Sequence, residues 1–134
     1  MIPIAAILIR NPKGELFVAK RKNTKRVDPG LFGIGAGGHV EDSETPAAAA
    51  ARELFEETGI VTPLTPLFSF DFHNGDRHQT DHWFETQYDG KIPNHEEEWE
   101  WSDWMTVAEV DKLATEGRLC PDTALFYEKY KQRH

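Results

Sequence analysis

Cysteine is almost absent from this chain of 134 residues, which contains only Cys120. One thiol cannot form a disulfide within the chain, and it cannot supply the cysteine ligands of a structural zinc site. A long apolar run is also missing, because no stretch approaches the roughly 18 residues that predict a transmembrane helix. The apolar residues 2–9 lack a basic leader and a cleavage site, so we interpret them as a strand and not as a signal peptide. We therefore expect a cytoplasmic protein with no membrane partner.

Basic residues are fewer than acidic residues in this chain. Lys and Arg number 15 against 23 Asp and Glu, which gives a formal net charge of −8. Binding to a nucleic acid polymer normally needs a basic patch, so we do not expect nucleic acid as a partner. A small anionic substrate is still compatible with this balance, because bound divalent cations reverse the local electric field.

The length and the 39% of hydrophobic residues predict one domain with one apolar core. Periodicity and turn residues predict strands and helices in an order that fits an α/β/α sandwich with a central mixed sheet. The predicted strands lie at residues 2–10, 16–20, 61–72, 82–88 and 98–105, and the predicted helices at 46–58, 107–116 and 121–133. Residues 31–39 are rich in glycine, which allows the backbone to approach a ligand closely.

The first predicted helix has clear end signals. Thr45 is a good N-cap, and Gly59 is a natural stop at the C-terminal end. We expect Ala47, Ala50 and Leu54 to face the core, because they recur at helical spacing.

This helix also carries a dense acidic cluster. Glu53, Glu56 and Glu57 are spaced at i, i+3 and i+4, so a helix places all three on one face. Carboxylates so close together repel each other unless a cation neutralises them. Hard oxygen ligands of this kind suit Mg²⁺ or Mn²⁺ better than zinc.

The same stretch resembles the Nudix box, Gly-x5-Glu-x7-Arg-Glu-U-x-Glu-Glu-x-Gly-U, in which U is an aliphatic residue. Residues 38–60 match this motif at every defined position, namely Gly38, Glu44, Arg52, Glu53, Leu54, Glu56, Glu57, Gly59 and Ile60. The resemblance implies a Nudix-type α/β/α sandwich over residues 1–134 and a divalent metal cofactor, Mg²⁺ or Mn²⁺.

The resemblance also implies roles for individual residues. In Nudix hydrolases the paired glutamates of the box bind the metals, which here are Glu56 and Glu57. Glu53 is then a metal ligand or the general base, and the backbone carbonyl of Gly37 adds a further ligand. Which acid serves as the base is left open.

Other candidates surround this core. Glu44 and Arg52 are expected to pair and orient the helix and its carboxylates. A further acid from outside the box often completes such sites, and among residues 96–98 we favour Glu98. Arg21, in the basic run after the second strand, is the candidate for binding substrate phosphates, and His39 is a second candidate for substrate contact.

The sequence therefore predicts a Mg²⁺-dependent pyrophosphohydrolase that cleaves a nucleoside diphosphate linked to another group. An enzyme like isopentenyl-diphosphate isomerase is an alternative, although the catalytic cysteine of that branch lies upstream of the box and residues 1–37 contain none. A noncatalytic nucleotide sensor is the other alternative. The identity of the substrate, and whether a second copy of the chain is a partner, are left open.

Overall fold

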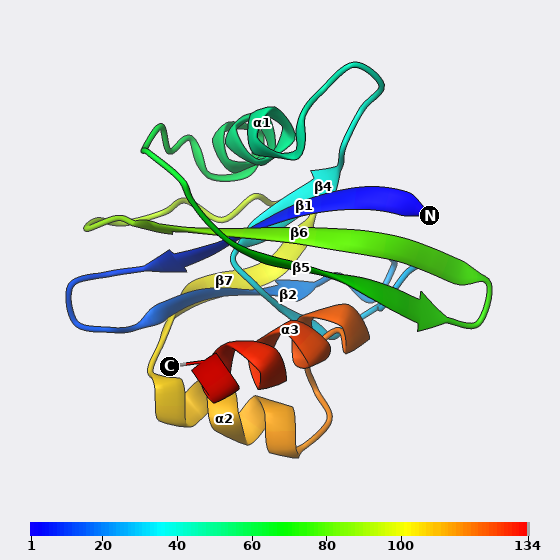
Figure 1. Ribbon diagram of the computed structural model, residues 1–134. Helices are drawn as coiled ribbons and strands as arrows, with labels where there is room; N and C mark the ends of the chain where they lie inside the picture. The colour runs from blue at the N-terminus through cyan, green and yellow to red at the C-terminus, as the bar shows by residue number, and fades with distance from the viewer. Residues whose placement is uncertain (134) are drawn as a thin grey trace.

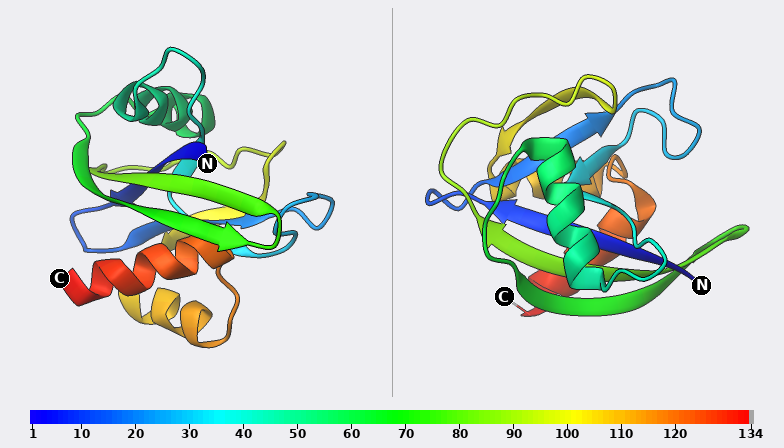
Figure 2. Two further views of the ribbon diagram at one scale, coloured as in Figure 1. Left: turned by 45° about the vertical axis from the view of Figure 1, so that its right-hand side comes forward. Right: turned by 90° about the horizontal axis from the view of Figure 1, so that it is seen from above.

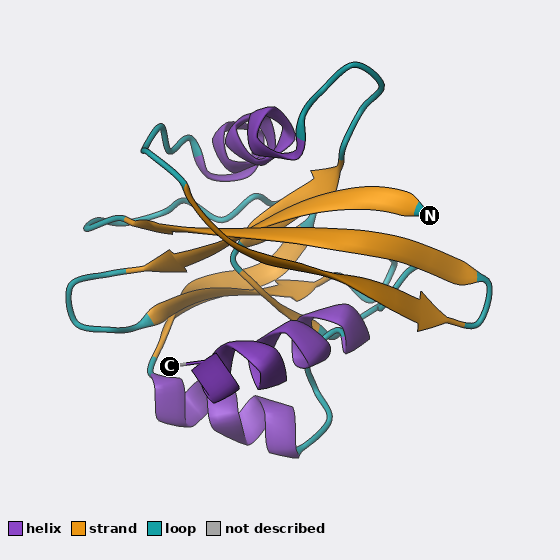
Figure 3. Cartoon of the chain, in the orientation of Figure 1, coloured by secondary structure: helices purple, strands orange, loops and turns teal. Residues whose placement is uncertain are grey.

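The computed structural model describes residues 1–133, in which a mixed seven-stranded sheet lies between helix α1 on one face and helices α2 and α3 on the other (Figures 1 and 3). This arrangement confirms the predicted α/β/α sandwich. The helices are α1 (Pro46–Thr58), α2 (Val107–Thr115) and α3 (Pro121–Arg133). The strands are β1 (Ile2–Arg10), β2 (Leu16–Arg21), β3 (Phe32–Ile34), β4 (Ala36–His39), β5 (Thr65–Asn74), β6 (Arg77–Gln87) and β7 (Trp99–Met105).

The sheet divides where β1 and β2 separate. These two strands pair only near the turn that joins them, at Arg10 and Leu16. Further along, the edge of β1 that faces β2 near the turn pairs with β4 instead. Strand β2 pairs with β3 and β7. On its other side β1 runs parallel to β6 over its whole length, and β5 forms the edge beyond β6. The sheet is therefore split into two halves at the end that carries the glycine-rich stretch (Figure 2).

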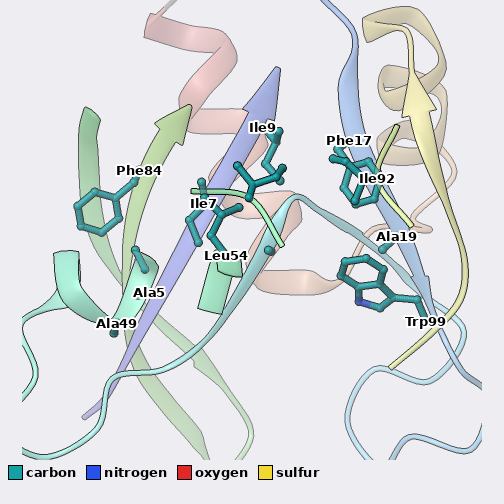
Figure 4. Packing of buried hydrophobic residues seen from close by; sticks show 13 residues of the cluster. Ala5, Ile7, Ile9, Phe17, Ala19, Ala49, Leu54, Phe84, Ile92 and Trp99 are labelled. Atoms are coloured by element: carbon teal, nitrogen blue, oxygen red, sulfur yellow. The ribbon is translucent and has the colours of Figure 1, made fainter. Parts of the chain in front are cut away.

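Each face of the sheet has its own apolar cluster, because alternate side chains of a strand point to opposite faces. Ile7, Leu54, Phe84 and Trp99 belong to the cluster beneath α1 (Figure 4). On the other face, Trp83 stacks on Phe126 of α3 with ring centroids 3.6 Å apart. Helix α1 is thus held to the sheet by packing, and not by helix propensity alone.

Helix α1 ends where the sequence predicts. The Thr45 side chain accepts a hydrogen bond from the backbone N–H of Ala48, and Gly59 takes the left-handed conformation at the C-terminal end. One expectation is wrong: Ala47 is exposed, and the buried alanines are Ala49 and Ala50. With 3.6 residues per turn, Ala47 lies roughly a quarter turn from the centre of the buried stripe. The helix is rolled so that Glu53 and Glu57 face strand β4.

Two strand boundaries also differ from those predicted. The strand expected from residue 61 begins at Thr65, since the preceding Pro63 cannot donate to a strand ladder. Its partner begins at Arg77 and not at His82, because the hairpin turn needs only the residues around Gly75. Both strands are longer toward their shared turn than their sequence pattern indicates. Within residues 1–133, no helix is long and apolar enough to cross a membrane.

Candidate active site

Arg52 is the centre of a hydrogen-bond network that ties α1 to the loop before it. Its Nε and Nη2 donate to the two carboxylate oxygens of Glu44 at 2.8 and 2.9 Å. Its Nη1 donates to Glu53 at 2.8 Å and to Glu56 at 3.4 Å, and Nη2 also donates to the backbone oxygen of His39 at 3.1 Å. Two parallel bonds to one carboxylate make the Arg52–Glu44 pair specific for arginine. Hydrogen bonding from Arg52 lowers the pKa of Glu44 to about 2.

The carboxylates of Glu53 and Glu57 converge on strand β4. Glu57 accepts a hydrogen bond from the backbone N–H of Gly37 at 3.3 Å. A Cβ atom on Gly38 would lie 2.6 Å from the Glu53 carboxylate, so only glycine leaves this side chain its place. Burial, followed by hydrogen bonding to Glu53 and the charge of Glu53, raises the pKa of Glu57 to about 9. Because the two carboxylates lie so close together, the charged form of Glu57 is disfavoured.

This pair fits a hard divalent cation by its chemistry, because a cation would offset the repulsion and favour the charged form of Glu57. In the arrangement of residues 1–133, no three acidic, histidine or cysteine side chains form a complete ligand set. Glu56 is exposed and turns toward Arg52, and Glu98 forms an ion pair with Lys25 at 2.8 Å. Either carboxylate has to leave its cationic partner to become a third side-chain ligand.

A cavity of about 380 Å³ opens beside Glu57 and extends through the division in the sheet. Its walls come from both halves of the sheet, from the glycine-rich residues 33–39, and from the start of α3. The volume lies within the roughly 300–1,000 Å³ that is usual for small-molecule sites. Glu57 and Glu98 line it near α1, and the charge of Glu98 contributes to the raised pKa of Glu57.

The other sequence candidates lie around the same cavity. Gly37, His39 and Arg21 all line it. The Arg21 side chain donates from Nε to the backbone oxygen of Val27 at 2.9 Å, which leaves its terminal nitrogens available within the described structure. Among the tryptophans, Trp83 and Trp99 are buried and line the cavity, whereas Trp101 is 40% exposed and lies outside it.

The far end of the cavity, beside α3, carries polar residues that the sequence analysis did not single out. Gln79 donates from Nε2 to Asp81 at 2.6 Å and to Asp122 at 3.1 Å. Arg77 donates to Asp28 at 3.2 Å, and its guanidinium lies 5.1 Å from the centre of the Phe72 ring. All of these polar side chains except Asp81 line the cavity directly.

Asp81 is fully buried, which is unusual for a carboxylate. Burial, and then the charge of Asp122, raise the pKa of Asp81 to about 7, while the bond from Gln79 opposes that shift. A sequence signal for this group does exist. Gln79, Asp81 and Trp83 alternate along one strand, so they share the face that packs on α3. Polar residues at two such inward positions indicate a function beyond packing.

The NUDIX domain profile matches residues 2–127, and the chain belongs to the Nudix hydrolase family. An uncharacterized Nudix hydrolase of Streptomyces coelicolor is 30% identical over 125 residues, covering 91% of this chain and 69% of that protein. One from Listeria monocytogenes is 31% identical over 121 residues, covering 86% of this chain and 69% of that protein. An isopentenyl-diphosphate Delta-isomerase of Halorhodospira halophila is 38% identical over 72 residues, but the match spans only 54% of this chain and 41% of the isomerase.

Solved structures show the same fold. The MutT protein of Methanosarcina mazei superimposes with a TM-score of 0.82 at 24% identity, covering 98% of this chain and 94% of that one. The NUDIX domain of Shewanella oneidensis NrtR, crystallised with ADP ribose, gives a TM-score of 0.74 at 14% identity, covering 99% and 88%. At these identities the likeness concerns architecture alone.

Proposed function

We propose that this protein is a Mg²⁺- or Mn²⁺-dependent hydrolase that cleaves a phosphoanhydride bond in a nucleoside diphosphate linked to another group. We also propose that residues 1–134 form one Nudix domain, active in the cytoplasm. The observation that carries the proposal is the position of Glu57, which lies half-buried against Glu53 on the wall of a cavity large enough for a nucleotide. A raised carboxylate pKa at such a wall is typical of a functional site.

In this proposal Glu57 and Glu53 hold the cation, with the carbonyl of Gly37 and the carboxylates of Glu56 and Glu98 as further ligands. A bound divalent cation neutralises phosphate charge and lowers the pKa of a bound water. Glu53 is a metal ligand or the base that takes the proton of the attacking water. It lies beside Glu57, whose carboxylate a bound cation would keep charged.

The remaining site residues position the metal ligands and the substrate. Arg52 fixes Glu53 and is itself fixed by the two bonds to Glu44, so the pair sets the direction of the ligand carboxylate. Arg21 and His39 lie on the cavity wall and contact the phosphates or the leaving group. The cationic side chain of Arg21 suits a phosphate, which it can bind by two parallel hydrogen bonds.

The test is a panel of nucleoside triphosphates, sugar nucleotides and dinucleotides assayed with Mg²⁺, with a chelator, and after Mg²⁺ is restored. Glu57→Gln should lower kcat by at least about 10² because it removes a ligand charge. Glu128→Gln is the matched control, since Glu128 is an exposed glutamate on α3, on the opposite face of the sheet. Turnover that is unchanged in chelator would contradict the metal assignment, and no turnover of any compound by folded protein would favour a sensor.

The isomerase alternative has one observation in its favour, because Cys120 lines the same cavity. Burial, and then the charge of Asp28, raise the pKa of the Cys120 thiol to about 12, so the thiol is neutral at physiological pH. It therefore does not resemble an activated nucleophile. Isomerisation of isopentenyl diphosphate that is lost in Cys120→Ala, together with no hydrolysis of nucleotides, would support this alternative over hydrolysis.

A further inference from the structure

Two histidines face each other across the β5–β6 hairpin, outside the candidate active site. His73 of β5 is the direct cross-strand partner of His78 of β6. Their Nδ1 atoms lie 2.9 Å apart, and the ring centroids lie 4.6 Å apart with the ring planes at 88° to each other. Both side chains are exposed, and neither lines the cavity. We call His73 and His78 the histidine pair.

The hairpin holds the histidine pair in place on one face of the sheet. Alternate residues of paired strands share a face, so Asp71 with Thr80, and Ser69 with His82, are the next two cross-strand pairs on that face. Side-chain hydrogen bonds join both of them, from Thr80 to Asp71 at 2.9 Å and between Ser69 and Nδ1 of His82 at 2.8 Å. These neighbouring contacts fix the register, and they limit how far the two imidazoles can move apart.

Contact between two Nδ1 atoms restricts how the imidazoles carry their protons. For a hydrogen bond, one Nδ1 carries a proton and donates, while the other accepts with its lone pair. When both rings carry their protons on Nε2 instead, two Nδ1 lone pairs point into the space between the rings. A cation in that space is bound by both nitrogens, because neutral imidazole is a metal ligand. The histidine pair can therefore exchange a hydrogen bond for a metal ion without a change in the number of bound protons.

The spacing of the two nitrogens indicates which metal ion fits. Metal–imidazole bonds of about 2.0–2.1 Å to two nitrogens 2.9 Å apart enclose an angle of about 90°. This is the angle between neighbouring ligands in square-planar or octahedral coordination, whereas a tetrahedral zinc site needs nitrogens roughly 3.3 Å apart. Imidazole ligands in tetragonal geometry are typical of Cu²⁺ and Ni²⁺. Mg²⁺ prefers oxygen ligands, so it does not compete for the histidine pair.

The surroundings of the histidine pair favour a cation and leave room for it. Strand β5 contains no Lys or Arg, and the basic residue of β6, Arg77, lies on the other face, where it pairs with Asp28 at 3.2 Å. Asp71 adds a carboxylate at the neighbouring position of β5 on the same face. The turn of the hairpin extends beyond the end of α1, so that helix does not cover this end of the strands (Figures 1 and 2). Water can therefore occupy the remaining positions around a metal ion.

We propose that the histidine pair binds one Cu²⁺ or Ni²⁺ ion through the Nδ1 atoms of His73 and His78, with water in the remaining positions. The ion ties β5 to β6 beside their turn. Arg77 and Gln79, on the opposite face of the same stretch of β6, line the cavity, so the ion also fixes a segment of the cavity wall. This site is independent of the proposed function, because no residue of the candidate active site takes part in it.

Calorimetric titration of Ni²⁺ into the full chain, carrying no histidine tag and kept in excess Mg²⁺, tests the proposal. We expect one Ni²⁺ ion per chain. His73→Gln and His78→Gln should each weaken Ni²⁺ binding at least about tenfold, because each removes a ligand. The double variant should bind no more weakly than either single variant, because one imidazole alone is not a chelate. Unchanged Ni²⁺ affinity in either single variant would overturn the proposal.

Two further variants locate the ion. His82→Gln is the matched control, since His82 lies on the same face of β6 but bonds to Ser69, and it should leave Ni²⁺ affinity unchanged. Glu57→Gln separates the histidine pair from the candidate active site. The Ni²⁺ site should persist in Glu57→Gln and be lost in His73→Gln. A site that is lost in Glu57→Gln and retained in His73→Gln would place the ion at the glutamates and contradict the proposal.

Nuclear magnetic resonance of the imidazole rings identifies the ligands directly. Cu²⁺ is paramagnetic, so a substoichiometric amount should broaden the ring signals of His73 and His78 first. The signals of His39 and His95, which lie on β4 and in the loop before β7, should stay sharp. Equal broadening at every histidine would show that the ion binds without a defined site and would overturn the proposal. Circular dichroism of each variant verifies that the fold is intact.

Discussion

The carboxylate of Glu53 occupies the space where Gly38 would carry a side chain, 2.6 Å from the position of its Cβ atom. The first glycine of the box is thus required by a glutamate fifteen residues later in the sequence, and not by its own backbone, since its φ is not positive. A methyl group at this position would push the Glu53 carboxylate away from Glu57 and from the cavity. This relationship gives the glycine a function that can be tested.

Gly38→Ala should lower turnover at least about tenfold, as expected when a metal-ligand environment is disturbed, while the melting temperature changes little. The reason is that the obstructing atoms are the far end of a flexible side chain. Gly37→Ala is the contrasting variant, because its Cβ would meet the backbone oxygen of Ala5 at 2.6 Å and should lower stability as well. Steady-state kinetics and thermal melts check both variants, and equal melting losses for Gly38→Ala and Gly37→Ala would contradict this account.

The raised pKa of Glu57 predicts how the stability of the metal-free protein depends on pH. In the unfolded chain Glu57 loses its proton near its ordinary pKa of 4.5, whereas in the folded protein it retains it up to about 9. Between these values the folded state binds more protons, so the free energy of unfolding should fall as pH rises from about 4.5 to about 9. Glu57→Gln should remove this component and make the metal-free protein more stable than wild type at pH 8.

Urea denaturation of both proteins with chelator at pH 5, 7 and 8.5 measures the difference. We expect the gain in stability of Glu57→Gln over wild type to grow with pH. A gain that is independent of pH would show that the folded protein does not hold the proton on Glu57. Adding Mg²⁺ should reverse the order of stability at pH 8, because the cation binds the charged carboxylate of the wild type.

The sequence predicts the helix and the residue types of this site better than it predicts how their side chains pack. The box defines α1 with its Thr45 cap and Gly59 end, and it identifies Arg52 and the glutamates, because their spacing reflects a local helix. The rotation of α1 about its own axis is not determined by the sequence of the helix alone. The burial of Ala49 in place of Ala47 therefore depends on how α1 packs on the sheet. The i, i+4 spacing of Arg52 and Glu56 does favour the ion pair that the structure shows between them.

The polar residues at the end of the cavity beside α3 could not be grouped from the sequence for a different reason. Gln79 and Asp122 lie 43 residues apart in sequence and meet only because β6 and the start of α3 border one cavity. Each residue alone is an ordinary polar residue in a strand or a helix start. Gln79, Asp81 and Trp83 alternate in the sequence, but the strand that the sequence predicts begins at His82, so it includes Trp83 and leaves out Gln79 and Asp81.

Because Glu98 forms an ion pair with Lys25, the role of Glu98 can be tested by substituting either residue. If Glu98 binds the metal, Glu98→Gln should weaken Mg²⁺ binding about tenfold or more. Lys25→Met should then strengthen it or leave it unchanged, because the carboxylate is released from its cationic partner. If Glu98 serves only the ion pair, the two variants should have equal and small effects, since exposed pairs contribute little. Titration calorimetry with Mg²⁺ distinguishes the two outcomes.

Arg52→Lys tests whether the guanidinium positions the metal site or binds substrate. Arg52 makes two parallel bonds to Glu44 while a third nitrogen reaches Glu53, and a lysine ammonium cannot reproduce this geometry. We expect Mg²⁺ affinity and kcat to fall together, by roughly 10- to 100-fold, without a selective rise in KM. Glu44→Gln should give the same pattern, because it removes the partner that fixes the guanidinium, whereas Arg118→Lys, an exposed arginine outside the cavity, should change neither quantity. A rise in KM alone, with Mg²⁺ affinity unchanged, would place Arg52 against a substrate phosphate and contradict the positioning role.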